Sequence, residues 1–281
     1  MPEMQWINAI IFAVFGLTIG SFLNVVIHRL PKMMERRWSA ECAEFSGKPL
    51  EESAPFNLMV PRSRCPHCEH QIRWYENIPV LSYVFLLRGR CSSCKEPISF
   101  RYPAIEIICS ALFFGCAWRW GYSIQTLVWC IFCATLLTLT MIDWDETLLP
   151  DDLTLPLLWL GLVAAALEWI PVGLKNAFWG VVAGYMSLWL IYWAFKLLTG
   201  KEGMGYGDFK LYAALGAWFG WQALIPIILI AAIVGAVVGI AMKINSSLRE
   251  GGYVPFGPFL SGAGFITLYF GPAYLVSRLI G

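Results

Sequence analysis

The aspartates of this chain are placed where a two-carboxylate site could form. All five lie either between residues 143 and 152 or at position 208, within Gly205-Tyr206-Gly207-Asp208. Acids are costly in a largely apolar, membrane-type sequence, so their position near the ends of apolar segments is a functional hint. Two neighbouring carboxyl groups hold one proton between them near neutral pH. One can then activate water while the other protonates a carbonyl oxygen or a leaving amine, which is aspartyl protease chemistry without a metal.

Asp143 and Asp208 are the predicted pair, because each lies at an end of an apolar segment on the same predicted membrane face. Gly205 and Gly207 support Asp208, since glycine allows backbone conformations and close approach that other residues do not. The other acids have more ordinary uses. Asp145 is expected in a solvated turn, and Asp151 and Asp152 are expected to cap the next helix.

Four cysteines form a second group with chemistry of its own. Cys65-Pro-His-Cys68 and Cys91-Ser-Ser-Cys94 are separated by 22 residues, a spacing close to that of a zinc ribbon. Two such pairs complete the tetrahedral shell of a structural zinc ion, and a reducing cytoplasm disfavours disulfides. His67 and His70 could replace a thiolate but are expected to be surface residues. Cys130 and Cys133 lie in an apolar segment and are expected to pack as small hydrophobic side chains.

The elements that position these groups are predicted to be membrane-spanning helices. Hydrophobic residues make up 58% of the 281 residues, charged residues 14%, and the mean hydropathy is +0.62. This composition favours an all-α polytopic membrane protein with about eight spans. The expected spans are 6–29, 102–119, 124–142, 153–170, 176–198, 208–221, 223–243 and 255–277.

Charge distribution predicts the orientation of the spans. With an outward amino terminus, the segments 29–101, 143–152, 199–207 and 244–253 are cytoplasmic, and 17 of the 20 Lys and Arg residues lie in or beside them. The first span lacks a cleavage motif and is expected to persist. Between the first two spans lies a small cytoplasmic domain, residues 30–101, whose part 35–61 is expected to be a loop. The net charge of +1 gives no indication of nucleic acid binding.

Five sequence blocks in order resemble a known family. They are Gly20 to Pro31 (GSFLNVVIHRLP), the tetracysteine segment, Ser99 to Glu106 (SFRYPAIE), Ile142-Asp143 with Leu149-Pro150-Asp151, and Gly203 to Asp208 (GMGYGD). Together they resemble the bifunctional type IV prepilin leader peptidase/N-methyltransferase family of GxGD membrane aspartyl proteases. The resemblance covers nearly the whole chain and implies that Asp143 and Asp208 are catalytic.

The resemblance also implies substrates, cofactors and a location. The enzyme would cleave the short basic leader of membrane-inserted prepilins and pseudopilins, then transfer a methyl group from S-adenosylmethionine to the new amino terminus. Gly89 and Arg90, with zinc in the cysteine domain, are implied in methyl transfer, and Glu106 either supports that site or pairs with Arg101. Residues 1–29 would be the first transmembrane helix and 102–281 the peptidase core. The protein would lie in the bacterial inner membrane with its amino terminus in the periplasm.

Helix ends suggest different roles for the two acids. Asp208 is predicted to begin a helix, where the positive end of the helix dipole favours its anion. Asp143 is predicted near the end of a helix, where the negative end disfavours ionisation. On this argument Asp208 is the base that activates water, and Asp143 holds the proton.

Two other classes of protein fit parts of the pattern. An ion- or proton-coupled transporter with a structural zinc ribbon would use the acids for ion coupling. A structural membrane partner would tolerate loss of both Asp143 and Asp208. Asn24 and His28 share one face of the first span, and hydrogen bonding between helices explains them as well as substrate contact does.

Overall fold

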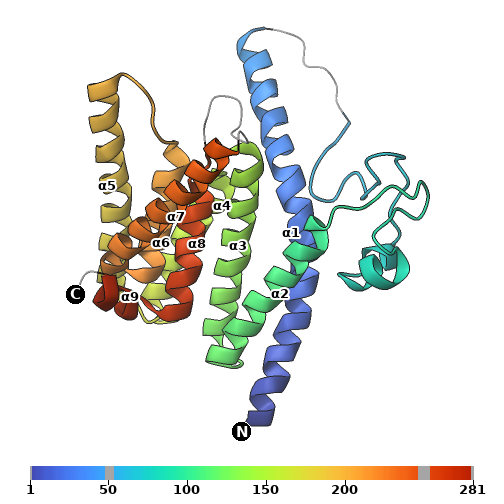
Figure 1. Cartoon of the computed structure of the whole chain (residues 1–281), viewed down its shortest axis with the longest axis horizontal. Coiled ribbons are helices and arrows are strands. Elements are labelled where there is room, and N and C mark those ends of the chain that lie inside the picture. Colours follow the sequence, from blue (N-terminus) through green and yellow to red (C-terminus); the bar gives the residue numbers. More distant parts are fainter. Residues whose placement is uncertain (1, 48–53, 246–253, 280–281) are drawn as a thin grey trace. The chain divides into compact units, whose positions relative to one another are not determined.

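The chain folds into helices. The computed structural model describes residues 2–47, 54–245 and 254–279, and these ranges contain helices and two isolated β-bridges but no strand. The main helices, labelled in Figure 1, are α1 (Pro2–Phe45), α2 (Arg101–Trp120), α3 (Ile124–Glu146), α4 (Asp151–Ala166), α5 (Leu174–Thr199), α6 (Tyr206–Phe219), α7 (Leu224–Ile244), α8 (Gly257–Phe270) and α9 (Pro272–Leu279). The chain divides into two compact units, Met1–Ala134 and Thr135–Gly281, and α3 crosses the division.

Every predicted span contains a helix, but eight spans are not confirmed. Four segments of the described residues are long and apolar enough to cross a bilayer: Met4–Phe45, Ile124–Glu146, Leu174–Thr199 and Trp221–Ile244. A fifth is obtained if α8 and α9 count as one bent span. At 16 and 14 residues, α4 and α6 are shorter than the ~20 residues that cross a bilayer.

The predicted loop 35–61 is wrong at its beginning. Helix α1 continues through Pro31 to Phe45, a length of 44 residues. Residues 32–45 contain mainly Lys, Met, Glu, Arg and Ala, which favour helix, so the chain stays helical beyond the apolar segment. Residues 48–53 of the predicted loop lie outside the described residues.

In the first unit, α2 crosses α1 at two glycines (Figure 1). A Cβ atom at Gly16 would lie 2.8 Å from the Cα of Ser110, and one at Gly20 would lie 2.7 Å from the Cα of Glu106. The two helix backbones therefore approach closely, as small residues at a spacing of four allow. Asn24 stabilises the crossing by donating a 3.1 Å hydrogen bond to the Tyr102 carbonyl.

Helix α6 is the core of the second unit. Its residues from Leu211 to Phe219 are all buried, as expected for a helix that is apolar on all sides. Gly216 packs backbone to backbone against Gly180 of α5. On the α4 side, the Trp218 indole donates a 2.9 Å hydrogen bond to the Leu157 carbonyl.

The predicted last span 255–277 is broken. Helices α8 and α9 meet at Gly271 with a bend of 105°. Gly271 has φ of +87° and Pro272 follows it, a combination that ends one helix and starts another in a new direction. The preceding predicted cytoplasmic loop, 244–253, lies outside the described residues from residue 246 onward.

Candidate active site

Asp143 and Asp208 lie within electrostatic range of each other inside the second unit. Asp143 lies in the last turn of α3 and Asp208 in the first turn of α6. Their exposed fractions are only 5% and 7%, and the charge of Asp143 acts on Asp208. Two buried carboxyl groups within electrostatic range cannot both ionise readily, so the arrangement suits one shared proton.

Each acid is held by a backbone amide at the start of a helix. The N–H of Gly257, the first residue of α8, donates a 3.0 Å hydrogen bond to Oδ2 of Asp143. Asp208 accepts from the backbone of Gly205, the N-cap residue of α6. From the sequence, only the end of α3 was expected to act on Asp143. The Gly257 amide at the start of α8 offsets part of the effect of the α3 end on Asp143, so the difference that helix ends make between the two acids is smaller than the sequence suggests.

Leu149 packs against the glycines beside both acids. A Cβ at Gly207 would lie 2.7 Å from the Leu149 Cβ, and a Cβ at Gly257 would lie 3.2 Å from its Cδ1. The Gly257 Cβ would also lie 2.6 Å from Asp143 Oδ2. Gly257 was missed by sequence reasoning. The proline that follows it, typical of a helix start, was the available signal.

The capping role predicted for Asp151 is wrong. Pro150 occupies the N-cap position of α4, and Asp151 is the first helical residue. The Asp151 carboxylate instead accepts two 2.7 Å hydrogen bonds from Lys210, two residues beyond Asp208. This ion pair joins the starts of α4 and α6 beside the buried acids. Asp152 shares the first turn of α4, and Asp145 is half-buried in the last turn of α3.

The structure brings the four cysteines of the first unit together. The sulfur atoms of Cys65, Cys68, Cys91 and Cys94 all lie within 4.8 Å of one another. Backbone amides of Cys94 and Ser93 lower the pKa of Cys91 to about 6. The four clustered sulfur atoms match the donor set of a tetrahedral zinc site, and the lowered pKa of Cys91 favours the thiolate form that binds zinc.

Two equivalent knuckles build this cluster, a repeat that was not predicted from the sequence. Cys65 N–H donates to the His70 carbonyl at 2.9 Å, and Cys91 N–H donates to Glu96 at the same distance. The fifth residue of each knuckle has positive φ, 56° at Glu69 and 63° at Lys95. Both knuckles are closed by a β-bridge, Arg64 with Gln71 and Arg90 with Pro97. The repeat explains why the two Cys pairs point at a common centre.

The histidines beside the first knuckle are not in the cysteine cluster. His70 Nε2 lies 3.7 Å from Oε2 of the buried Glu76, and His67 is exposed on the surface.

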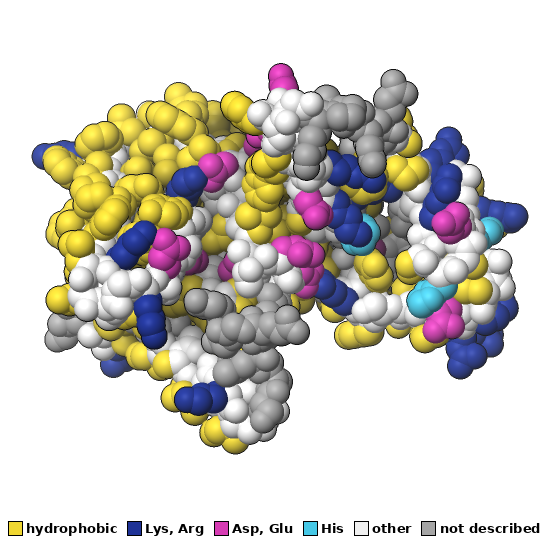
Figure 2. All heavy atoms as spheres, turned by 90° about the horizontal axis from the view of Figure 1, so that it is seen from above, with side chains coloured by type: hydrophobic (Ala, Val, Ile, Leu, Met, Phe, Trp, Pro, Cys, Tyr) yellow, Lys and Arg dark blue, Asp and Glu magenta, His cyan; other side chains and the backbone are white. Residues whose placement is uncertain are grey.

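Charged side chains gather on the surface of the cysteine domain, as Figure 2 shows. Among them are the exposed Arg62, Arg64, Arg73, Arg88, Arg90 and Lys95.

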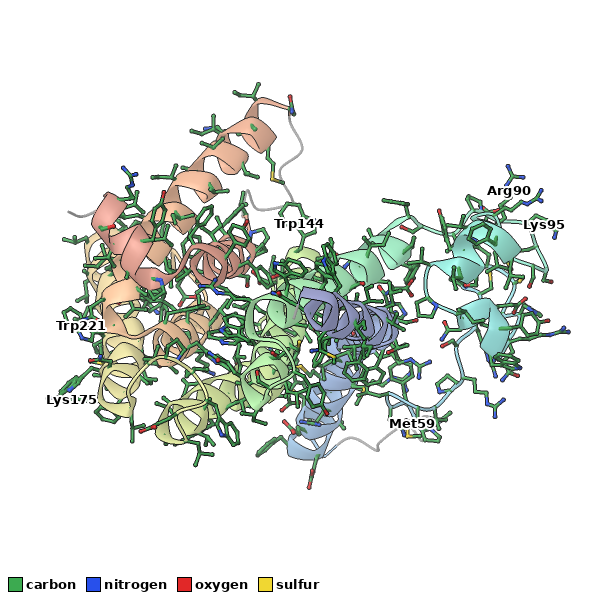
Figure 3. All side chains as sticks on the ribbon, turned by 90° about the horizontal axis from the view of Figure 1, so that it is seen from below. Met59, Arg90, Lys95, Trp144, Lys175 and Trp221 are labelled. Carbon is green, nitrogen blue, oxygen red and sulfur yellow. The ribbon has the colours of Figure 1, made fainter. Side chains whose placement is uncertain are left out.

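The three methyl-transfer candidates occupy different environments. Glu106 is 8% exposed, and its Oε2 accepts a 2.8 Å hydrogen bond from the Val80 N–H. Gly89 has φ of +70° and lies against the Tyr83 ring. Arg90 is exposed and extends outward with Lys95 at the edge of the domain (Figure 3). Glu106 and Gly89 therefore lie toward the interior of the first unit, whereas Arg90 does not.

Comparison with known proteins defines the family. Residues 14–120 match the model of the bacterial peptidase A24 N-terminal domain, and residues 130–240 match the type IV leader peptidase family. The buried acids thus belong to a membrane peptidase domain. No solved structure matches the chain.

Curated relatives extend the match over almost the entire chain. A protein of Stutzerimonas stutzeri named "Prepilin leader peptidase/N-methyltransferase" is 52% identical over 95% of this chain and 92% of its own length. Proteins of the same name from Pseudomonas aeruginosa and Burkholderia pseudomallei are 51% and 52% identical, covering 91% and 94% of this chain and 88% and 86% of their own lengths. The chain belongs to the prepilin leader peptidase/N-methyltransferase family, and the transporter alternative is not favoured.

Proposed function

We propose that this protein cleaves the basic leader of type IV prepilins and pseudopilins and then methylates the new amino terminus. The buried pair Asp143 and Asp208 is the observation that carries the peptidase half. The relatives' shared name, over nearly the full chain, supports both halves.

Cleavage follows from one proton held between two carboxyl groups. The ionised acid takes a proton from water as the water oxygen attacks the peptide carbonyl carbon. The protonated acid donates to the carbonyl oxygen. When the C–N bond breaks, the acid that took the water proton donates it to the leaving nitrogen, and a hydroxyl of the tetrahedral intermediate gives its proton to the other acid, which restores one proton on the pair. The amides of Gly257 and Gly205 hold the two carboxyl groups in place through these transfers.

The proposal includes a membrane arrangement and two cofactors. Eight spans would place Asp143, Asp208 and the cysteine domain on the cytoplasmic side of the inner membrane, with the amino terminus in the periplasm. Zinc would be held by Cys65, Cys68, Cys91 and Cys94 in a structural role. S-adenosylmethionine, when bound, supplies an electrophilic methyl group to the amine.

Co-expression with a prepilin tests both halves together. Intact mass spectrometry of the pilin is expected to show loss of the leader and gain of one methyl group when this protein is present. An uncleaved prepilin would contradict the peptidase activity. A cleaved but unmethylated pilin would contradict the methyltransferase activity alone.

A further inference from the structure

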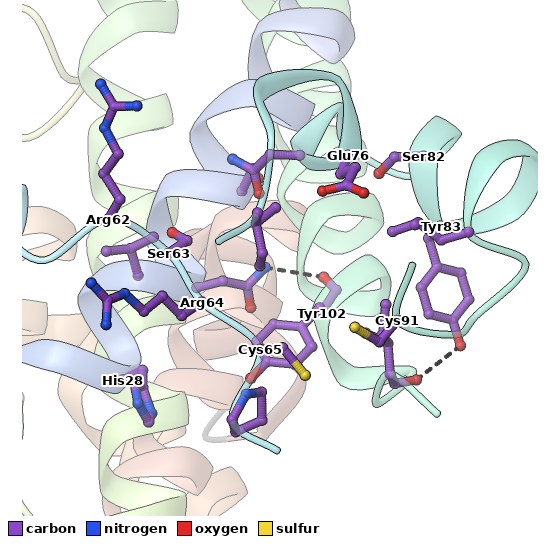
Figure 4. A pocket seen from close by; sticks show the side chains of 18 of the residues that line it. His28, Arg62, Ser63, Arg64, Cys65, Glu76, Ser82, Tyr83, Cys91 and Tyr102 are labelled. Carbon is purple, nitrogen blue, oxygen red and sulfur yellow. Dashed lines mark hydrogen bonds between the residues drawn. The ribbon is translucent and has the colours of Figure 1, made fainter. Parts of the chain in front are cut away.

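A cavity in the first unit is suited to a charged small molecule. It has a volume of about 400 Å³ and lies between α1, α2 and the cysteine domain (Figure 4). This size falls within the ~300–1,000 Å³ of small-molecule sites. Its walls come from chain segments far apart in sequence, including Asn24, Ser63, Tyr83 and Glu106.

From this cavity we infer the binding site of S-adenosylmethionine, an inference that rests on the proposed methyltransferase function. The molecule carries a sulfonium, an ammonium, a carboxylate, a ribose diol and an adenine ring. The cavity offers counterparts to the cationic groups, the carboxylate and the adenine ring. Glu106 and Glu76 provide negatively charged groups for the sulfonium and ammonium. Arg62 and Arg64 provide positively charged groups for the carboxylate, and Tyr83 provides an aromatic ring for the adenine. Figure 4 labels four of these five residues; Glu106 also lines the cavity.

Glu106 is the acid that most needs such a ligand. The bonds that hold its buried carboxyl group come from the Val80 N–H and the Ser21 hydroxyl, both uncharged donors. The described residues give Glu106 no ion pair, so its alternative pairing with Arg101 is not observed. A buried carboxylate without a cation is costly. A sulfonium or ammonium group in the cavity would offset that cost.

Gly89 lies next to Tyr83, whose side chain lines the cavity. A Cβ at Gly89 would lie 3.3 Å from the Tyr83 hydroxyl and 3.4 Å from the ring carbon that bears it. The Gly89 N–H donates to the Tyr83 carbonyl at 2.9 Å, and the Tyr83 hydroxyl donates to Ile98 at 3.3 Å. Gly89 is therefore a positioning residue that sets where the Tyr83 ring lies.

The cysteine cluster forms part of the cavity wall. Cys65 and Cys91 are both buried and both line the cavity, as do Ile72 and Ile98 at equivalent positions of the two knuckles. A metal that fixes the knuckles would fix this wall. The geometry thus links the structural metal to methyl-donor binding.

Direct binding tests the assignment. S-adenosylmethionine is titrated by calorimetry into the full-length, zinc-loaded protein in detergent micelles. Glu106→Gln is expected to weaken binding by about tenfold, because a charged hydrogen-bond acceptor is lost. Glu41→Gln is the matched control, since Glu41 is exposed on α1 and does not line the cavity. Equal affinity of Glu106→Gln and the wild type would overturn the assignment.

A measurement on the wild type keeps the test independent of variant folding. Photo-cross-linking with an azido derivative of S-adenosylmethionine is followed by peptide mapping. Label is expected on peptides from residues 61–83 or 98–106. Label confined to Thr135–Gly281 would overturn the site while leaving the methyltransferase function intact. Failure of the wild type both to bind the donor and to methylate cleaved pilin would overturn the function and the site together.

Discussion

Gly257 donates its backbone N–H to the Asp143 carboxylate across 3.0 Å, so the start of α8 holds an acid that belongs to α3. These residues are 114 positions apart in sequence. A side chain at position 257 would occupy the space of Asp143 Oδ2, since the Cβ would lie only 2.6 Å away. Position 257 therefore requires glycine because the Asp143 carboxylate leaves no room for a Cβ atom, and not because of the backbone conformation.

Gly257→Ala should lower prepilin cleavage by about 100-fold, the effect of displacing a catalytic group by roughly 1 Å. Gly262→Ala is the control on the same helix, because a Cβ there would meet no atom within 4 Å. Cleavage is measured as the rate of leader loss in detergent-solubilised membranes. Similar rates for the two variants would show that the Gly257 contact does not position Asp143.

The ion pair between Lys210 and Asp151 should position Asp208 more than it stabilises the fold. The two side chains are 28% and 51% exposed, so solvent screening limits their contribution to the free energy of unfolding to about 1 kcal/mol or less. Lys210→Gln and Asp151→Asn should each slow cleavage severalfold, and the double variant should be no slower than either one. Additive losses in this double-mutant cycle would mean that the residues act separately.

Cys91→Ser should remove bound zinc and pilin methylation together while leaving prepilin cleavage largely intact. The four sulfur atoms form one cluster, so loss of one ligand opens the shell. Metal content by mass spectrometry should fall from one zinc per chain to none. Cys42→Ser is the control, because Cys42 is exposed on α1 outside the cluster. Full zinc content in Cys91→Ser would contradict the predicted ligand set.

Gly89→Ala should reduce methylation roughly tenfold, because the new Cβ presses on Tyr83 and a positive φ costs alanine about 1 kcal/mol or more. Gly47→Ala carries the same backbone cost at φ of 62° but meets no atom within 4 Å. Arg90→Ala should retain most activity, since Arg90 extends away from the domain. The result is read from the methylated fraction of cleaved pilin. A greater loss of methylation in Arg90→Ala than in Gly89→Ala would contradict the role given to Gly89 in positioning Tyr83.

The sequence was most informative where the signal is local. Apolar segments identified a helix in every expected span, and paired cysteines identified the group that the fold brings together. The continuation of α1 beyond Pro31 was missed because polar helix formers look like a loop when only hydropathy is followed. The break at Gly271-Pro272 carried a readable local signal that the apolar pattern obscured.

What could not be predicted depends on contacts between distant segments. The Gly257 amide on Asp143 and the pairing of Lys210 with Asp151 arise only when separate helix ends meet. The same holds for the cavity lined by Glu106, because its walls come from three parts of the first unit. Hydrophobic pattern specifies which segments are buried, but it does not specify which ends become neighbours.

Cleavage of a co-expressed prepilin by Asp143→Asn, Asp208→Asn and the double variant tests most directly whether these two acids form the peptidase site. Asp145→Asn serves as the control acid from the same turn of α3. Each single variant should lose at least about 1,000-fold in cleavage rate, and the double variant should lose little more, because the acids act as a unit. Asp145→Asn should cleave at close to the wild-type rate. Leader removal that persists in the double variant would contradict the assignment.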